Sequence, residues 1–504
     1  MGFERARGPR SVGPRRLERS TEHGLDALAR DLSRPQQGGC RSRAIDDGRL
    51  DAHVAVTTVD DEQLLRDADA HCLLPVAARD EPEPATVYVR GQGLELTDIH
   101  GRVYLDMMGS HTRANSLGYG NAEIAAAVHE QLATLHYVGT VRHLAPPTIE
   151  LAATLARLAP GRLDKAMFVS GGSEAVEAAL KLARQYQQAS GRKPRAYKTI
   201  SRWTAYHGAT MGALSVTDWL PVREVADPRV PGHSFVPNPT NWRNAFGLDD
   251  EAYADLCATA LERQIELEGP EHVAAFIGEP IMQAHGVQIP PRRYWQRVRE
   301  ICDRYGVLLI ADEVITGFGR TGAWFACEHF GLEPDIMTMA KALTAGYAPM
   351  GAVITRAEIA DTLPMFRHVH TFSGHAACAA AANAAIRIKE RDALIPRARQ
   401  NGEYVRQALE DAVGSHPIVG QVRGLGHWHA VELTADRRSK APPTEDLVAA
   451  VVRHMRDASG VLACTIGNAF EMAPPLTATR EQLDCAVEAT ARAVHEVAKE
   501  RGLG

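Results

Sequence analysis

The stretch from Gly306 to Gly346 reads GVLLIADEVITGFGRTGAWFACEHFGLEPDIMTMAKALTAG. Its residues 307–311 form a run of apolar, mostly aliphatic side chains, which predicts a strand buried on both faces, as in a parallel sheet. The run ends at Asp312, and open α/β sheets bind ligands beyond the carboxyl ends of such strands. A second run, residues 335–340, is followed at once by Lys341. The pattern favours an α/β protein in which an acid and a lysine can face each other across one site.

An acid and a lysine in this arrangement suit the chemistry of pyridoxal phosphate. The cofactor needs a lysine amine for its Schiff base and an acid against its pyridine nitrogen. That acid keeps the nitrogen protonated, so that the ring can accept electrons from the substrate. The alternative is a surface Lys341 and a strand-end Asp312 that never meet.

The same stretch contains Gly317-Phe-Gly-Arg-Thr-Gly322, which matches the GxGxxG dinucleotide fingerprint. A lone match is weak evidence. Residues 312–316 separate it from the strand, and no clear helix follows it, so a nicotinamide site is not favoured.

The composition is ordinary for a soluble globular protein. The chain has 504 residues, of which 45% are hydrophobic and 23% charged, and this length allows two or three domains. The net charge of −6 argues against a nucleic-acid surface. The eight cysteines are scattered without a CxxC pair, which favours a reducing cytoplasm over disulfides or a zinc site. No apolar run approaches the roughly 20 residues of a membrane span, and no secretory signal is recognisable.

Two further strand ends carry chemical groups. Ser170-Gly-Gly-Ser-Glu-Ala175 follows a buried strand and precedes a helix predicted at residues 176–186. The backbone N–H groups of Gly171, Gly172 and Ser173, with the helix dipole, can bind a phosphate. The alternative is an ordinary helix start with Ser173 as its N-cap.

An aromatic group and a second acid follow other predicted strands. Tyr206, His207 and a glycine come after a strand predicted at residues 196–201, and Glu279 follows another at residues 274–278. An aromatic ring in this place can stack on a planar cofactor or belong to the core. His368 with His370, and His427 with His429, have no carboxylate or cysteine at ligand spacing, so no metal site is predicted.

Around these motifs the rest of the chain divides into recognisable parts. Residues 1–45 are rich in Arg, Gly, Ser and Pro and are predicted to be disordered. Residues 86–106 alternate and contain turn glycines, which predicts an antiparallel meander, and residues 218–250 are predicted to be a long ordered loop. Further helices are predicted at residues 60–72, 121–135, 148–158, 254–267, 376–391, 403–413, 445–458 and 480–499, and further strands at 166–169, 351–355, 424–433 and 461–472.

Taken in order, residues 85–500 resemble the class III, or ω-type, aminotransferases, which have the fold-type I architecture of pyridoxal-phosphate enzymes. The matching signatures are Ser170-Gly-Gly-Ser-Glu-Ala, Tyr206-His-Gly, Gly278-Glu-Pro, Ala311-Asp-Glu-Val-Ile-Thr-Gly-Phe-Gly-Arg-Thr-Gly322, Ala340-Lys-Ala-Leu, Thr371-Phe-Ser-Gly-His and Ala473-Pro-Pro-Leu476. The resemblance implies a large domain with a mostly parallel central sheet and a smaller α+β domain. The expected division is a disordered extension (1–45), the first part of the small domain (46–125), the large cofactor-binding domain (126–375) and the rest of the small domain (376–504).

The resemblance also assigns roles to matching positions. Lys341 would carry the cofactor, and Asp312 would be the partner of its pyridine nitrogen. Family members are homodimers with shared sites. The remaining cofactor contacts implied by the resemblance are Gly171, Gly172 and Ser173 at the phosphate, Val314 under the ring, Tyr206 above it with His207 nearby, Glu279 near cofactor and substrate, and Thr371 at the phosphate of the neighbouring subunit.

One departure from the family pattern bears on the substrate. Many members place an arginine that holds the substrate carboxylate before Pro-Pro-Leu, whereas this alignment puts Glu471 there. A glutamate in the site favours a cationic or hydroxyl-rich amine, such as a polyamine, an amino sugar or an aminoglycoside precursor. The alternatives are that Glu471 turns away or that the alignment is shifted by a residue. His111 and Arg113 are further candidates for substrate contacts, with Arg113 or Arg142 for the carboxylate of the acceptor.

The expected activity is therefore the transfer of an amino group between a primary amine and a keto acid or aldehyde. An aminomutase, epimerase, decarboxylase or phospholyase on the same fold would keep the cofactor and change the reaction. A non-catalytic binding protein and a Rossmann oxidoreductase are the rivals from other classes.

Overall fold

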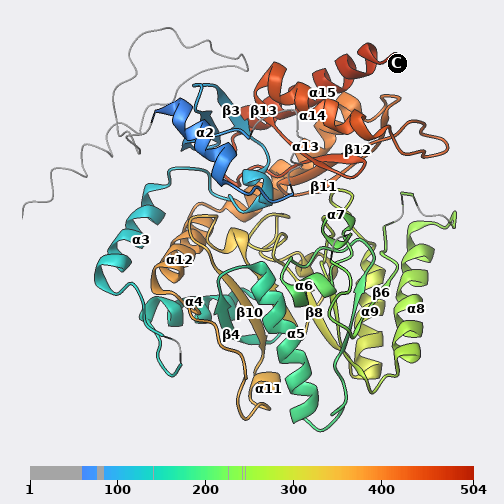
Figure 1. Ribbon diagram of the computed structural model, residues 1–504. Coiled ribbons are helices and arrows are strands. Elements are labelled where there is room, and N and C mark those ends of the chain that lie inside the picture. Colours follow the sequence, from blue (N-terminus) through green and yellow to red (C-terminus); the bar gives the residue numbers. More distant parts are fainter. Residues whose placement is uncertain are drawn as a thin grey trace, which may run out of the picture. The chain divides into compact units, whose positions relative to one another are not determined.

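The computed structural model describes residues 60–76, 85–139, 141–224, 226–240, 242–243 and 246–503. The prediction for residues 1–45 lies outside the described residues. The centre of the described chain is a seven-stranded sheet (Figure 1). Its strands, in spatial order, are β4 (Leu163–Val169), β10 (Gly351–Arg356), β9 (Ile336–Met339), β8 (Leu308–Asp312), β7 (Val273–Gly278), β5 (Lys198–Arg202) and β6 (His233–Val236).

Most neighbours in this sheet are parallel, as predicted. Strands β9, β8, β7, β5 and β6 pair in parallel, and β10 runs antiparallel to both β9 and β4. Strand β4 therefore points the same way as β9. The carboxyl ends of β4, β5, β7, β8 and β9 consequently meet at one edge of the sheet, which is where such sheets bind ligands.

Helices cover both faces of the sheet because its strands are apolar on both sides. In β8, Leu309 and Ala311 belong to one apolar cluster, and Leu308 and Ile310 belong to another. Helix α5 (Gly172–Ala189) contributes to the second cluster. The other face is covered by α4 (Pro146–Leu158), α8 (Asp250–Glu268), α9 (Arg292–Tyr305) and α12 (Ala376–Arg391).

Two smaller sheets accompany the central one, and a third apolar cluster joins them to three long helices. One sheet contains the predicted meander, β1 (Tyr88–Gln92), β2 (Glu95–Asp98) and β3 (Val103–Asp106), with β13 (Val461–Leu462) beside β3. The other has the order β11 (Val419–Leu425), β12 (Trp428–Leu433), β15 (Ala469–Met472) and β14 (Cys464–Ile466). The helices are α13 (Leu394–Val413), α14 (Glu445–Ser459) and α15 (Arg480–Glu500) (Figure 1). The domain boundaries stay a prediction.

Three predicted elements were wrong in detail. Residues 218–250 are not one loop, because they include α7 (Leu220–Arg223) and the strand β6, which is short and pairs on one side only. The strand predicted at residues 424–433 is mostly the second arm of the β11–β12 hairpin, which turns at Gly426 with a left-handed φ of +56°. Residues 461–472 form three short strands rather than one.

The remaining elements are α2 (Asp61–His71), η1 (Gly109–Arg113), α3 (Ala122–Thr134), α6 (Met211–Ser215), α10 (Cys327–Phe330), η2 (Lys341–Leu343) and α11 (Ala357–Ala360).

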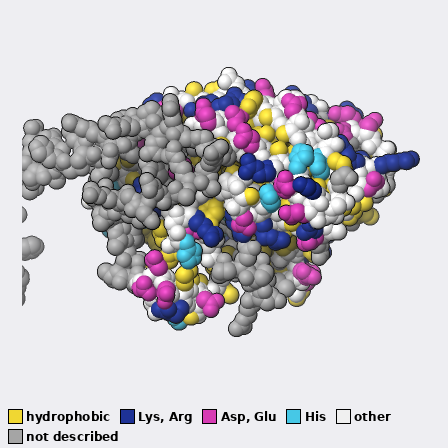
Figure 2. Space-filling view, turned by 90° about the horizontal axis from the view of Figure 1, so that it is seen from above, with side chains coloured by type: hydrophobic (Ala, Val, Ile, Leu, Met, Phe, Trp, Pro, Cys, Tyr) yellow, Lys and Arg dark blue, Asp and Glu magenta, His cyan; other side chains and the backbone are white. Residues whose placement is uncertain are grey.

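Basic and acidic side chains of the described residues are interspersed on the face seen in Figure 2. Among the described helices, none combines the length and the apolar character needed to cross a membrane.

Candidate active site

Asp312 is held at the edge of the sheet by hydrogen bonds from three directions. It is the last residue of β8 and is only 4% exposed. Its Oδ2 lies 2.6 Å from His207 Nδ1, and its Oδ1 accepts from Thr338 Oγ1 at 3.0 Å and from Val314 N at 3.1 Å. Because Asp312 and Thr338 are partners in the β8–β9 register, the sheet itself fixes the carboxylate.

Lys341 follows β9 at the same edge and begins the short helix η2. Its backbone has a left-handed φ of +48°. Burial lowers the pKa of its amine from 10.5 to about 8, and the charge of Arg113 acts in the same direction, whereas Asp312 and Glu279 act against it. An amine with this pKa is partly neutral near pH 7.5 and can therefore act as a nucleophile or a base.

Glycines allow three segments to meet beside the start of α5. Gly171 is the N-cap of this helix, so Ser173 is not. A Cβ on Gly172 would lie 2.9 Å from Val314 Cγ1, and a Cβ on Gly208 would lie 2.5 Å from Ser173 Oγ. Ala209 N donates to the same Ser173 oxygen at 3.2 Å. The helix start therefore lies directly against Val314 and the segment after β5.

Tyr206 and Glu279 are joined at the ends of β5 and β7. Glu279 Oε1 accepts from Tyr206 N at 3.3 Å, and Oε2 accepts from Gln283 N at 3.0 Å. Burial raises the pKa of the Glu279 carboxyl. The ring of Tyr206 packs edge-on against Trp219 at 5.6 Å between centroids. Both side chains thus have fixed orientations beside Asp312 and His207.

These residues fit pyridoxal phosphate. The helix start that would receive the phosphate presents Gly172, where a Cβ would meet Val314, and Gly171, where a Cβ would meet nothing within 4 Å, and α5 directs its N-terminal backbone N–H groups outward. Asp312 would hold the pyridine nitrogen, and Lys341 would carry the cofactor. The cofactor, when bound, supplies a ring that draws electrons from the substrate carbon.

A buried ion pair lies at what we call the acid end of the site, defined by Arg113, Glu471 and Trp428. Arg113 Nη2 forms an ion pair with Glu471 Oε1, and the two side chains are 5% and 1% exposed. Trp428 Nε1 donates to Glu471 Oε2 at 2.6 Å, and Arg113 Nη1 donates to His111 O at 2.8 Å. Glu471 is thus not an isolated negative charge. The prediction that it selects a cationic amine stays a prediction. Arg113 offsets the negative charge on which that prediction rests.

Arg320, from the Gly317–Gly322 motif, braces the acid end. This fully buried residue donates to the carbonyls of Arg113 at 3.3 Å, Asn115 at 3.4 Å and His427 at 3.1 Å. Burial lowers the pKa of its guanidinium to about 9. The glycine motif therefore positions an arginine in this structure.

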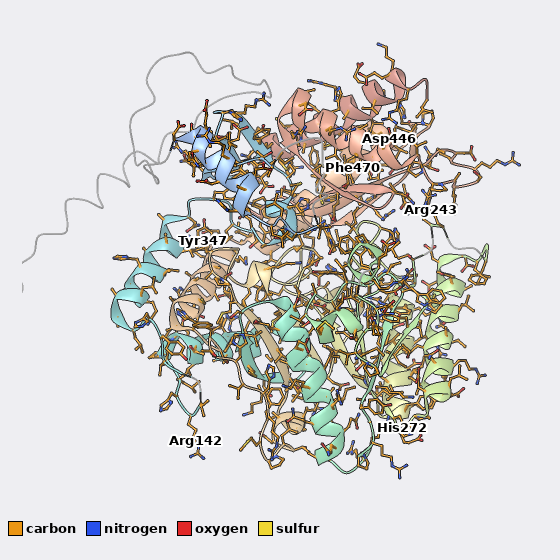
Figure 3. All side chains as sticks on the ribbon, viewed as in Figure 1. Arg142, Arg243, His272, Tyr347, Asp446 and Phe470 are labelled. Carbon is orange, nitrogen blue, oxygen red and sulfur yellow. The ribbon has the colours of Figure 1, made fainter. Side chains whose placement is uncertain are left out.

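The other predicted substrate and partner residues lie in different places. His111 Nε2 is 3.9 Å from Cys464 Sγ beside Arg113. Thr371 is exposed, its carbonyl accepts from Tyr137 Oη at 3.0 Å, and the adjacent His370 contacts Glu174 in the first turn of α5. Arg142 is exposed between α3 and α4, far from Phe470 in Figure 3.

Sequence reasoning missed Thr338, Trp428, Arg320 and Cys464 as parts of the site. Thr338 could have been found from the strand register, because it stands opposite Asp312. Arg320 lies inside the Gly317–Gly322 motif, whose GxGxxG pattern points to a nucleotide and not to a buried arginine. Trp428 and Cys464 reach the site only through the pairing of β12, β15 and β14, for which the sequence has no local signal.

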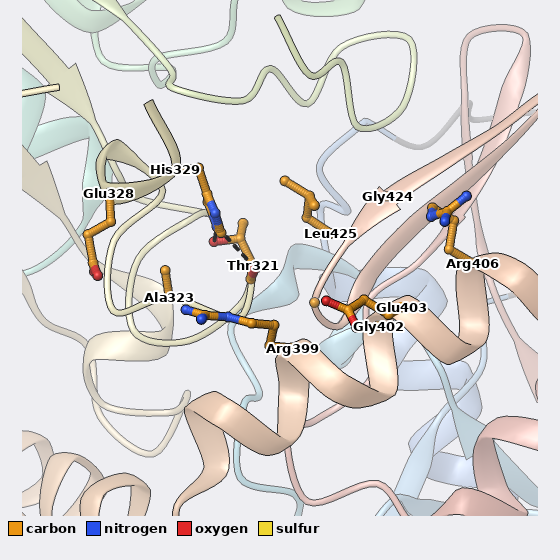
Figure 4. A pocket seen from close by; sticks show the side chains of 11 residues that line it. Thr321, Ala323, Glu328, His329, Arg399, Gly402, Glu403, Arg406, Gly424 and Leu425 are labelled. Atoms are coloured by element: carbon orange, nitrogen blue, oxygen red, sulfur yellow. Dashed lines mark hydrogen bonds between the residues drawn. The ribbon is translucent and has the colours of Figure 1, made fainter. Parts of the chain in front are cut away.

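A separate cavity of about 450 Å³ lies between residues 321–329, α13 and the β11–β12 turn (Figure 4). Its lining includes His329, Arg399 and Arg406, and it contains none of the predicted site residues. Within the described ranges, no cluster of three or more His, Cys, Asp or Glu side chains is arranged to hold a metal ion.

Comparisons with known proteins agree with this geometry. The family model described as aminotransferase class-III matches residues 76–494. A putrescine–pyruvate aminotransferase of Pseudomonas aeruginosa is 34% identical over 405 residues, which cover 79% of this chain and 88% of the relative. A taurine–pyruvate aminotransferase of Bilophila wadsworthia is 35% identical over 441 residues, which cover 84% of this chain and 94% of the relative.

A solved structure gives the same result. The omega transaminase from Pseudomonas jessenii in complex with PMP superimposes with a TM-score of 0.84 at 35% identity, over 88% of this chain and 99% of that one. The fold, the strand-end acid and lysine, and a family match across most of the chain point the same way. The chain belongs to the class III aminotransferases, which are pyridoxal-phosphate-dependent transaminases.

Proposed function

We propose that this aminotransferase transfers an amino group from a primary amine without an acid group to a keto acid, and that Arg113 binds the carboxylate of the keto acid. The buried pair between Arg113 and Glu471 carries the proposal. A guanidinium matches a carboxylate in charge and in geometry. Its charge is also close enough to contribute to the lowered pKa of Lys341.

The pair gives the two half-reactions different electrostatics. While Arg113 is bound to Glu471, the two charges cancel, which suits an amine that carries no acid. A keto acid brings a carboxylate that can replace Glu471 as the partner of Arg113. Arg113 then stays paired, while the displaced Glu471 keeps its hydrogen bond from Trp428 and needs a new partner or a proton, because a buried charge left without a partner costs about 3–5 kcal/mol.

Lys341 is proposed as the group that moves the proton. Its neutral Nζ would take the proton from the substrate carbon as a base and, once protonated, could deliver that proton as an acid. The lowered pKa of the amine keeps both protonation states accessible near neutral pH. Asp312, held by His207 and Thr338, would keep the pyridine nitrogen of the bound cofactor protonated.

The narrower expectation of a polyamine, amino sugar or aminoglycoside precursor depends on Glu471 alone, and Arg113 compensates that charge. Relatives of similar identity do not choose between donors, because one is named for putrescine, a diamine, and another for taurine, which carries a sulfonate. The proposal therefore stops at a donor without an acid group.

A homodimer is proposed from an exposed apolar surface. Tyr137 joins the segment between α3 and α4 to residues 365–372, through its hydrogen bond to Thr371 and a ring contact with Phe372 at 6.1 Å. The large apolar side chains that are more than half exposed on these two segments are Val141, Leu144, Met365, Val369 and Phe372. A second copy of the chain would cover them, and Thr371 would then reach the partner's phosphate site.

Light scattering of the purified protein measures its mass and so tests the dimer. Mixing the Lys341→Ala and Thr371→Ala variants tests the shared site, because heterodimers should recover some activity.

The decisive experiment compares donors with and without an acid group. Purified protein is given putrescine, an amino sugar, a simple monoamine or taurine, each with pyruvate or 2-oxoglutarate, and both products are counted. Transamination consumes one acceptor for each amine, whereas an aminomutase, epimerase, decarboxylase or phospholyase does not. Donors without an acid should be preferred, and Lys341→Ala is the inactive control. A preference for taurine would overturn the assignment of Arg113 to the acceptor alone.

A further inference from the structure

Cys464 and His111 form a thiol–imidazole pair at the acid end of the site. Cys464 lies on β14, directly opposite Glu471 in the β14–β15 register, and is 6% exposed. Its Sγ is 3.9 Å from Nε2 of His111, which is exposed. His111 belongs to the same segment as Arg113, whose Nη1 donates to the carbonyl of His111 at 2.8 Å. The thiol thus stands among an imidazole, a guanidinium and a carboxylate.

We propose that Cys464 is a nucleophilic thiol and a covalent modification site for carbon electrophiles that carry a carboxylate. The part played by the carboxylate rests on the proposed function, in which Arg113 binds acids. With iodoacetate as the probe, His111 Nε2 takes the thiol proton and the sulfur attacks the methylene carbon. The S–C bond forms as the C–I bond breaks, and iodide leaves with the electron pair. The product is carboxymethyl-Cys464 beside Arg113.

The charges around the thiol favour its reactive form, the thiolate. Burial alone would raise the pKa of Cys464, but contact with His111 and the charge of Arg113 outweigh it, so that this pKa lies below its ordinary value. Contact with Cys464 in turn raises the pKa of His111, and the charge of Asp106 acts in the same direction. Burial and the charge of Arg113 lower this pKa, but they do not outweigh the contact with Cys464. Glu471, across the β14–β15 ladder, is already paired with Arg113. Helix α14 contributes Val451 and Met455, in the apolar cluster that includes Ala463.

The chain contains a matched control in a second cysteine–histidine pair. Cys378 Sγ lies 3.7 Å from His375 Nδ1, so the two pairs have nearly the same separation. Burial raises the pKa of Cys378, and burial lowers that of His375. Among the described residues, no arginine charge offsets burial at the second pair, and Cys378 is half-buried whereas Cys464 is buried, so accessibility alone would favour Cys378. Reactivity at Cys464 relative to Cys378 therefore measures the effect of the acid end.

The test labels the holoprotein with iodoacetate or iodoacetamide between pH 6 and 9 and reads each cysteine by peptide mass spectrometry. At pH 7, Cys464 should react at least about ten-fold faster than Cys378, with a pH midpoint below the usual thiol value of about 8.5. The ratio of iodoacetate to iodoacetamide rates should be higher at Cys464 than at Cys378, because Arg113 attracts the carboxylate. His111→Asn should slow Cys464 and leave Cys378 unchanged.

Equal rates at the two cysteines in the wild-type protein would overturn the proposal, and so would a His111→Asn variant that labels at Cys464 as fast as the wild type. The wild-type comparison stands even if a variant fails to fold. Labelling of Lys341→Ala separates this inference from the proposed function, because the thiol should react as before although turnover is lost. Rapid labelling of Cys464 that pyruvate does not slow would support the thiol and would count against Arg113 as the acceptor's anchor.

Discussion

Two buried carboxylates, Asp312 and Glu471, are held in different ways. Asp312 accepts hydrogen bonds from Thr338 and from the Val314 backbone and pairs with His207. Glu471 accepts one from Trp428 and forms an ion pair with Arg113. In the roles proposed above, the partners of Asp312 would orient its carboxylate for a cofactor, whereas Arg113 offsets the charge of Glu471.

The two carboxylates differ in how freely their partners can separate from them. The groups around Asp312 come from strands of one sheet and from the segment after β5, so they have little freedom to separate. Trp428 and Glu471 come from the neighbouring strands β12 and β15 of one sheet, whereas Arg113 comes from η1, outside that sheet. An incoming acid can therefore compete for Arg113, whereas nothing in the reaction needs to displace His207 from Asp312.

Replacing the strand-end acid should have the largest effect. Asp312→Ala should lower kcat by roughly two to three orders of magnitude, because a preorganised charge at the reacting group is commonly worth that much. Asp312→Glu keeps the charge and should lose less. The measurement is the rate of each half-reaction, and both should fall together. A near-normal rate in Asp312→Ala would show that another group serves the pyridine nitrogen.

Replacing the arginine at the acid end should affect only one half-reaction. Arg113→Lys removes the planar fork and should raise KM for the keto acid about ten- to a hundred-fold, the size expected for a charged hydrogen bond. The KM for the amine should change far less. Glu471→Gln is the matched control, because it frees Arg113 and should improve donors that carry an acid. Equal changes in both half-reactions would remove the distinction between the two ends.

The sequence could point to the candidate cofactor residues because their signals are local, although their roles stay predictions. Asp312 ends one short buried strand, Lys341 follows another, and the glycines at the start of α5 come just after β4. The acid end could not be predicted in this way, since Arg113 meets Glu471 only after β15 has paired with β12. Strand β6 was missed because it has one neighbour and a weak apolar pattern. The role of Thr371, the domain boundaries and a cytoplasmic location stay predictions.

The pH dependence of cofactor uptake tests the lysine itself. A neutral amine is needed for covalent attachment, and burial lowers the pKa of Lys341 to about 8. Raising the pH from 6.5 to 8.5 should therefore increase the initial uptake rate of the apoprotein about twenty-fold, followed by a plateau. Absorbance at limiting pyridoxal phosphate gives the rate, and borohydride with peptide mapping confirms the site. A rate that still rises ten-fold per pH unit above 8.5 would indicate an ordinary, solvated lysine.

The smallest and sharpest test removes one neutral hydrogen-bond donor from each carboxylate. Thr338→Val deletes the donor to Asp312 Oδ1, and Trp428→Phe deletes the donor to Glu471 Oε2. A bond from a neutral donor to an ionised carboxylate contributes about 1.5–3 kcal/mol, and because other groups still hold each carboxylate we expect the lower end, roughly a ten-fold change. Thr338→Val should lower kcat equally for every amine and keto acid, because Asp312 acts in both half-reactions. Trp428→Phe should leave the amine half-reaction nearly unchanged and alter KM for the keto acid, since a less firmly held Glu471 changes its competition for Arg113. Steady-state kinetics with several donors at fixed acceptor, and the reverse, separate the two patterns. If both variants show the same pattern, the two carboxylates act as one unit and the division into two ends is wrong.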